Sequence, residues 1–142
     1  MTTYTNIAES LTKTAQNMPY KRAVVYPSGR TRDNHVLYRQ LTFKQLDHLS
    51  DRLAAGLENI GIVRGTRTIL MVPPGMEFFI IVFAMFKIGA VPVVVDPGMG
   101  IDRMVQCLHQ GRAKAFIGIE KAHLLRLVKP RYFKQIRHWV TV

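Results

Sequence analysis

The chain has 142 residues, 48% of them hydrophobic, so it can form one domain or part of one and is not disordered throughout. Its 20 Lys and Arg against 9 Asp and Glu give a formal net charge of +11. The single cysteine, Cys107, excludes an internal disulfide framework and favours a reducing compartment, so we expect a cytoplasmic protein.

No targeting or membrane-spanning segment is predicted. Residues Met1–Asn6 have neither a basic region nor an apolar run, so they do not resemble a signal peptide. The longest clean apolar run, Phe78–Phe86, is far shorter than the roughly 20 residues that a spanning helix needs.

The positive charge is concentrated near the C-terminal end. From Arg112 onward Lys and Arg recur, and the only acid is Glu120. Such a segment can attract an anionic membrane surface or nucleic acid, although a solvated basic surface is the plainer interpretation. We expect no nucleic-acid partner, because no zinc-finger spacing or glycine–aromatic RNA motif accompanies the charge.

Two amphipathic helices are predicted in the N-terminal half. Asn6 can cap the first, and its apolar positions recur every four residues at Ile7, Leu11 and Ala15. The second begins at Thr42-Phe-Lys-Gln45, which has the spacing of a capping box, and Gly61 can end it. Its apolar face comprises Leu46, Leu49, Leu53, Leu57 and Ile60.

A β-hairpin is predicted between these helices, with strands at residues 22–26 and 35–41. Pro27–Asn34 is turn-rich, basic and polar, so we expect a mobile loop there. The glycine-bearing segments Pro27–Arg30 and Pro97–Gly100 lack the Walker spacing for phosphate, and we interpret both as turns.

Helices and strands alternate from residue 41 onward. Strands are expected at 67–72, 91–95, 113–119 and 139–142, and helices at 76–88, 100–109 and 121–128. The alternation predicts an α/β fold: a layered, largely parallel sheet with helices on both faces, preceded by an N-terminal helix and β-hairpin.

The centre of this region predicts deep burial. Phe78–Phe86 is apolar almost all round, Gly89 suits the left-handed end of that helix, and the β-branched run Val91–Val95 predicts a strand covered on both faces. We expect Leu53 and Phe83 to be buried, one on each side of the sheet.

Three segments resemble the adenylate-forming (AMP-binding) superfamily of acyl-CoA synthetases, peptide-synthetase adenylation domains and luciferases. Leu41-Thr-Phe-Lys-Gln-Leu46 resembles its first core motif, and Phe86-Lys-Ile-Gly-Ala-Val-Pro-Val-Val-Val-Asp96 resembles its second. Gly61–Pro74 resembles the strand segment between them, and the resemblance extends over roughly residues 5–130. Asp96–Gly100 and Phe116–His123 look closest to fatty-acid CoA ligases and to the β-lactone synthetases of bacterial olefin biosynthesis.

This resemblance implies that residues 1–142 are the N-terminal portion of an AMP-binding domain that ends before the phosphate loop. The parent would use ATP and Mg to activate a fatty acid or 3-hydroxy fatty acid as an acyl-adenylate, with the fatty acyl substrate as its partner. The family's phosphate loop, aromatic-Thr-Glu motif, ribose-binding Asp and C-terminal Lys do not occur here, so we expect the fragment alone to be inactive and to bind neither cofactor. The alternative is a free-standing basic module that uses residues 112–138 to bind anionic lipid or nucleic acid.

No catalytic, cofactor-binding or metal-binding residue is assigned from the sequence. We interpret Cys107 as a buried small hydrophobe and Asp96 as a turn-forming residue, although Asp96 follows a strand at the edge where open α/β sheets bind ligands. No pair of histidines has the i, i+4 spacing with a Glu that a zinc helix needs. The histidines are His35, His48, His109, His123 and His138.

Overall fold

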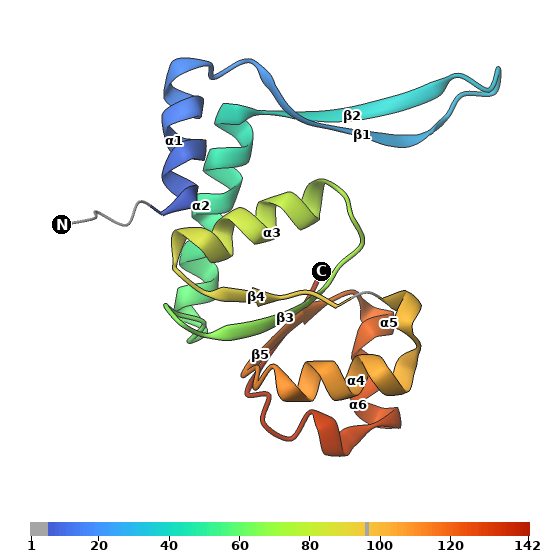
Figure 1. Cartoon of the computed structure of the whole chain (residues 1–142). Coiled ribbons are helices and arrows are strands. Elements are labelled where there is room, and N and C mark those ends of the chain that lie inside the picture. The colour runs from blue at the N-terminus through green and yellow to red at the C-terminus, as the bar shows by residue number, and fades with distance from the viewer. Residues whose placement is uncertain (1–5, 96) are drawn as a thin grey trace. The chain divides into compact units, whose positions relative to one another are not determined.

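A computed structural model describes residues 6–95 and 97–142 (Figure 1). These residues form two compact units. The first comprises the chain up to Ala55 together with Pro74–Lys87, and the second comprises Gly56–Pro73 together with Ile88–Val142. In the described part of the chain, no helix is both long enough and apolar enough to cross a membrane.

The first unit combines helices with a β-hairpin. The helices are α1 (Ile7–Asn17), most of α2 (Phe43–Asn59) and α3 (Met76–Lys87), and the strands are β1 (Arg22–Arg30) and β2 (Val36–Thr42). The side chains of Leu11, Val24, Leu41, Leu46 and Met76 form its core. The apolar positions of all these elements therefore meet in one cluster.

The first helix is capped as predicted, but its buried face is shifted. The Oδ1 atom of Asn6 accepts a hydrogen bond from the amide of Ala8 at 3.0 Å. Ala8, Leu11 and Ala15 are buried, whereas Ile7 is exposed. The prediction for Ile7 was wrong. Residues three or four positions before Leu11 can both share its face of the helix, and here Ala8, three positions before it, takes the buried position instead of Ile7.

The hairpin is longer than predicted. Pro27–Arg30 belongs to β1 rather than to a turn, and the antiparallel register shifts between Pro27 and Gly29. This bulge accommodates proline, which has no amide to donate, and Gly29 at φ 153°. The turn itself lies at Thr31–His35, where the amide of His35 donates to the Thr31 hydroxyl.

The second helix begins with the predicted capping box. The amide of Thr42 donates to Gln45 Oε1 at 2.9 Å, and the amide of Gln45 donates to Thr42 Oγ1 at 3.2 Å. Gly61 follows the helix at φ 91°, as predicted. The buried positions are Leu46, Ser50, Ala54 and Leu57. The apolar face therefore includes two small residues, and Leu53 is only half-buried while Ile60 is exposed.

The second unit contains a parallel four-stranded sheet in the order β4-β3-β5-β6. Its strands are β3 (Arg67–Met71), β4 (Val91–Val93), β5 (Ala115–Gly118) and β6 (His138–Thr141). Its helices are η1 (Pro97–Met99), α4 (Ile101–Gln110), α5 (Glu120–His123), α6 (Leu125–Val128) and η2 (Pro130–Tyr132). The predicted α/β fold with a parallel sheet is confirmed.

One face of this sheet is covered by helices of the same unit. Ile69 of β3 and Phe116 of β5 cluster with Met104, Val105 and Leu108 of α4. Ala122 of α5 and Phe133 beside η2 belong to the same cluster, as do Ala113 and Ile136. The buried face of α4 is thus the stripe formed by Met104, Val105 and Leu108, whereas Ile101 in its first turn is exposed.

The segment around residues 78–95 is less buried than predicted. Strand β4 has only three residues and lies at the edge of the sheet, with Val91 and Val94 exposed. Pro92 explains this position, because proline within a sheet is confined to edges and bulges. In α3, Phe83 is half-buried rather than buried, although it packs against the core of the first unit.

Candidate functional site

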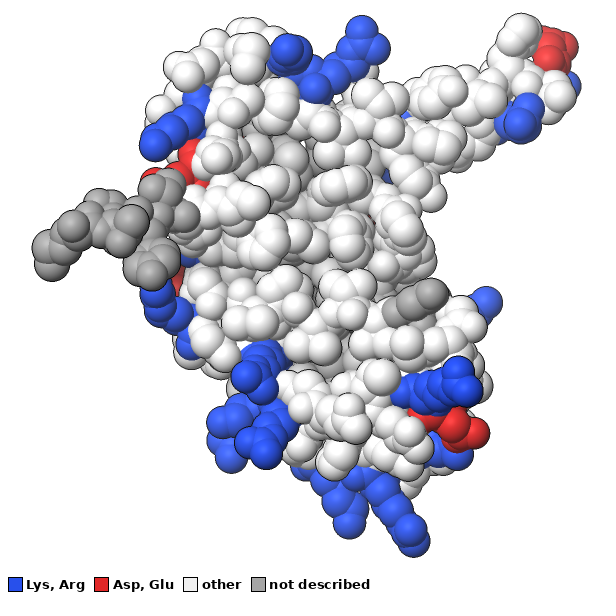
Figure 2. Space-filling view, in the orientation of Figure 1, with Lys and Arg blue, Asp and Glu red and all other residues white. Residues whose placement is uncertain are grey.

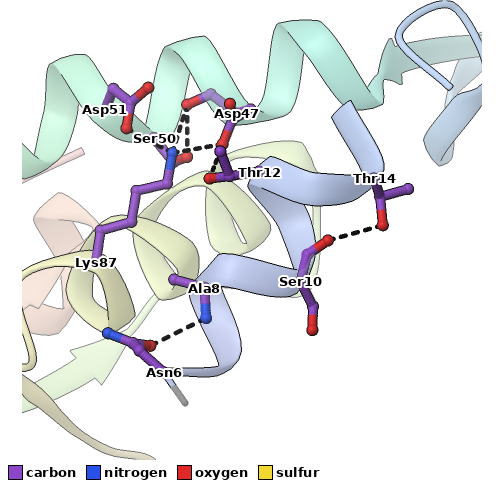
Figure 3. Close-up of polar contacts among 9 residues, drawn as sticks. All are labelled: Asn6, Ala8, Ser10, Thr12, Thr14, Asp47, Ser50, Asp51 and Lys87. Atoms are coloured by element: carbon purple, nitrogen blue, oxygen red, sulfur yellow. Dashed lines mark hydrogen bonds and ion pairs between the residues drawn. The ribbon is translucent and has the colours of Figure 1, made fainter. Parts of the chain in front are cut away.

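The second family-like motif contains a lysine that joins two helices of the first unit. The Nζ atom of Lys87 lies 2.7 Å from Asp47 Oδ1, 2.6 Å from Asp51 Oδ1 and 2.9 Å from the Asp47 carbonyl oxygen. Thr12 Oγ1 donates to Asp47 Oδ1 at 3.0 Å. Figure 3 shows the Lys87 ammonium between the two carboxylates of α2.

This geometry assigns Lys87 a structural role. An ammonium has three N–H donors, and here all three have acceptors, two of which are carboxylates. All of its donors are therefore occupied within the protein, and none is left to bind a substrate. The ion pairs hold the C-terminal end of α3 against the middle of α2, beside a hollow of about 490 Å³ that Asn6, Glu9 and Gln16 help to line.

A histidine at the end of α5 contacts the carboxyl ends of β5 and β6 inside an aromatic cluster. His123 Nε2 lies 3.2 Å from the Gly118 carbonyl oxygen, 3.1 Å from the Val140 carbonyl oxygen and 3.3 Å from Thr141 Oγ1. Carbonyl oxygens only accept, so Nε2 carries a proton. The ring therefore donates to both strands.

Aromatic rings surround this histidine. The ring centroid of His123 lies 5.1 Å from that of Phe116 and 5.6 Å from that of Trp139, and the Arg126 guanidinium lies 5.0 Å from the Trp139 centroid. No carboxylate in the described part of the chain hydrogen-bonds His123. The arrangement fixes the sheet edge and α5, but it does not form an acid–base pair.

The remaining sequence candidates are dispersed. Cys107 is exposed, so its prediction as a buried hydrophobe was wrong: it lies off the stripe of α4 formed by Met104, Val105 and Leu108. Asp96 lies outside the described residues. Pro97–Met99 forms η1 rather than a simple turn, and Gly100 precedes α4.

The described residues contain no cluster of three or more His, Cys, Asp or Glu able to hold a metal ion. Two acids that share a partner, Asp47 and Asp51, are already bound to the Lys87 ammonium. The donor set therefore does not fit a Mg–nucleotide site, and no catalytic step is assigned to these residues.

A basic pocket lies at the amino-terminal ends of β3 and β5, the end of the sheet opposite to His123. It is a hollow of about 380 Å³ lined by Arg64, Gly65, Thr66, Arg67, Arg112 and Lys114. Figure 2 shows Lys and Arg side chains gathered at the lower left of the view, where these strands start in Figure 1. The sequence indicated a basic segment from Arg112 onward but did not associate it with Arg64 and Arg67.

Outside this pocket, Lys129 of the second unit forms an ion pair. Lys129 Nζ donates to Asp102 Oδ1 at 2.8 Å and joins α4 to the residue before η2. The hydrogen bond and the negative charge of Asp102 raise the pKa of Lys129 above its usual 10.5. Lys129 therefore stays charged throughout the physiological range.

The family model described as "AMP-binding enzyme" matches residues 11–139. The olefin beta-lactone synthetase of Stenotrophomonas maltophilia is 46% identical over 125 residues, which are 87% of this chain and 23% of that protein. The medium-chain fatty-acid–CoA ligase of Escherichia coli is 33% identical over 132 residues, which are 93% of this chain and 20% of that protein. The chain thus spans about a quarter or less of the length of these relatives.

The fold also matches solved structures. The anthranilate CoA ligase AuaEII in complex with anthranoyl-AMP aligns with a TM-score of 0.80 at 20% identity, over 100% of this chain and 26% of that chain. The Mycobacterium tuberculosis fatty acyl CoA synthetase aligns with a TM-score of 0.78 at 21% identity, over 96% of this chain and 26% of that chain. With the family model extending over nearly all of the sequence, the chain belongs to the AMP-binding enzyme family.

Proposed function

We propose that this chain is the N-terminal part of an ATP-dependent acid ligase that activates a fatty acid or 3-hydroxy fatty acid as an acyl-adenylate. The observation that carries the proposal is the 46% identity to two olefin beta-lactone synthetases over 87% and 89% of the chain. Identity to the medium-chain fatty-acid–CoA ligase supports the same class of acid. ATP and Mg would serve the complete ligase.

Within such a ligase, the chain would act as a scaffold. Its family-like motifs support this role, because Thr42 and Gln45 cap α2 while Lys87 ties α3 to α2. None of these groups is available to stabilise the negative charge that develops when a carboxylate attacks a phosphate. The groups that bind the ATP phosphates and the groups that catalyse adenylation would come from outside these 142 residues.

A chimera tests this proposal. The matching N-terminal residues of the S. maltophilia synthetase are replaced by this chain, and acid-dependent pyrophosphate release is measured with ATP, Mg and long-chain 3-hydroxy acids. We expect the chimera to retain turnover on the acids that the unmodified synthetase uses. A chimera that melts cooperatively but releases no pyrophosphate would overturn the proposal.

The chain alone provides the second measurement. We expect no pyrophosphate release above the blank, because the sequence contains no phosphate loop. Acid-dependent turnover by a sample free of other ligases would contradict the scaffold role, while leaving membership of the family intact.

A further inference from the structure

The basic pocket is assembled by the topology of the sheet. Because β3 and β5 are parallel neighbours, both begin at the same end of the sheet. There the amide of Lys114 donates to the Arg67 carbonyl oxygen at 2.9 Å. Arg64 and Arg67 thereby meet Arg112 and Lys114, which are nearly 50 residues away in the sequence. Four cations consequently face one hollow.

The charge of this pocket is uncompensated within the protein. None of its six lining residues is acidic, and in the described residues none of the four cations forms an ion pair. Arg67 Nη1 donates to the Gly111 carbonyl oxygen at 3.3 Å, which is a neutral partner. Like charges that share a hollow repel each other, so an anion bound there would stabilise the unit.

The backbone at Arg112 provides an independent observation. This residue follows the end of α4 at φ 48°, a left-handed conformation that usually carries Gly or Asn. An arginine therefore occupies a position where glycine would be less strained. Strain of this kind is found at binding sites, where the side chain has a use that offsets its conformational cost.

We propose that this pocket binds a phosphate group and that its source is the headgroup of an anionic phospholipid. Guanidinium groups bind phosphate oxygens through paired hydrogen bonds, and the Lys114 ammonium adds a further positive charge. The Thr66 hydroxyl, which accepts from the Val63 amide at 3.1 Å, still has its own proton to donate.

The rim of the pocket favours a lipid over a free anion. Val63 is 47% exposed and Val91 is 43% exposed. Both adjoin the pocket, because the Thr66 amide donates to the Val63 carbonyl oxygen and the Val91 amide donates to the Thr66 carbonyl oxygen at 2.9 Å each. Exposed apolar side chains beside a basic cluster match the requirements of a membrane surface, where both apolar burial and attraction to anionic lipid contribute.

The experiment compares two doubly substituted chains of equal net charge. Arg112→Gly with Lys114→Gln alters the pocket, whereas Arg103→Gln with Lys121→Gln removes the same charge from exposed positions outside it. Co-sedimentation uses vesicles of phosphatidylcholine with and without phosphatidylglycerol, and calorimetry uses inorganic pyrophosphate. We expect about 30-fold weaker binding of the anionic vesicles by the pocket variant, and far less loss in the control.

The outcomes distinguish the source of the phosphate. Val63→Ser with Val91→Ser should weaken vesicle binding and leave pyrophosphate binding unchanged. Arg112→Gly alone should weaken binding while the melting temperature stays equal or rises, which a purely structural role of Arg112 would not produce. Binding of pyrophosphate without vesicle binding would keep the phosphate site but overturn the lipid source. Equal losses in both double variants, or no binding of either ligand, would overturn the site itself.

Discussion

Replacing Lys87 by methionine should destabilise the first unit, because it leaves Asp47 without its cation. The Lys87 side chain is 13% exposed and that of Asp47 is 18% exposed, so this pair is largely removed from water. The Asp51 side chain is 59% exposed, and its bond to Lys87 contributes little, on the order of 0.2–1 kcal/mol.

The magnitude follows from these exposures. Removing one partner of a fully buried pair costs about 3–5 kcal/mol, and the residual exposure of Asp47 and the hydrogen bond from Thr12 reduce this value. We therefore expect Lys87→Met to lower the free energy of unfolding by about 2–3 kcal/mol. Against a total of roughly 5–15 kcal/mol for a domain, such a loss is readily measured.

Urea unfolding followed by far-ultraviolet circular dichroism measures the effect through the helices. Asp51→Asn is the control, and it should cost less than about 1 kcal/mol. Adding Asp47→Asn to Lys87→Met should restore part of the loss, because the unpaired carboxylate is then gone. If Asp51→Asn costs as much as Lys87→Met, or if Lys87→Met is neutral, the assignment of Lys87 as the tie between α2 and α3 is wrong.

Three further outcomes are expected. Gly118→Ala should destabilise the chain by about 1–3 kcal/mol in urea, because the new Cβ would lie 2.7 Å from Phe116 Cε1; an unchanged midpoint would contradict this packing. Thr42→Ala should cost about 0.5–2 kcal/mol through loss of the capping box, with Thr42→Ser as the control that retains most of the stability. Lys129 should titrate by NMR above 10.5, and Asp102→Asn should return its pKa toward that value. Because this pKa is raised in the folded state, the stabilisation is complete below 10.5 and is lost as the pH rises through the folded pKa; an unchanged titration in Asp102→Asn would exclude the pairing.

Features governed by neighbouring residues could be predicted from the sequence. The capping box at Thr42 and Gln45, the cap at Asn6 and the left-handed glycines 61 and 89 depend on contacts within a few positions. The alternation of helices and strands similarly indicated the parallel sheet. These elements follow from local hydrogen bonding and periodicity.

Features that depend on the neighbours of a strand or helix could not be predicted in this way. Val91–Val95 has the composition of a central strand, yet the strand order places β4 at an edge. Cys107 adjoins the buried Leu108 in sequence but points away from the stripe that the sheet selects. The basic pocket forms because two segments that are distant in sequence lie side by side where β3 and β5 begin. The pairing of β3 with β5, which the sequence does not specify, brings them together.

The proline in β4 makes the two edges of this sheet unequal in backbone donors. The Val91 amide points toward β3, where it reaches the Thr66 carbonyl oxygen, and amides of successive strand residues point to opposite sides. The side of β4 that faces away from β3 therefore lacks the donor that residue 92 would otherwise supply, and an additional strand would lose a hydrogen bond there. At the other edge, all residues of β6 from His138 to Thr141 retain their amides. An additional strand would therefore find a full set of backbone donors at β6 but not at β4.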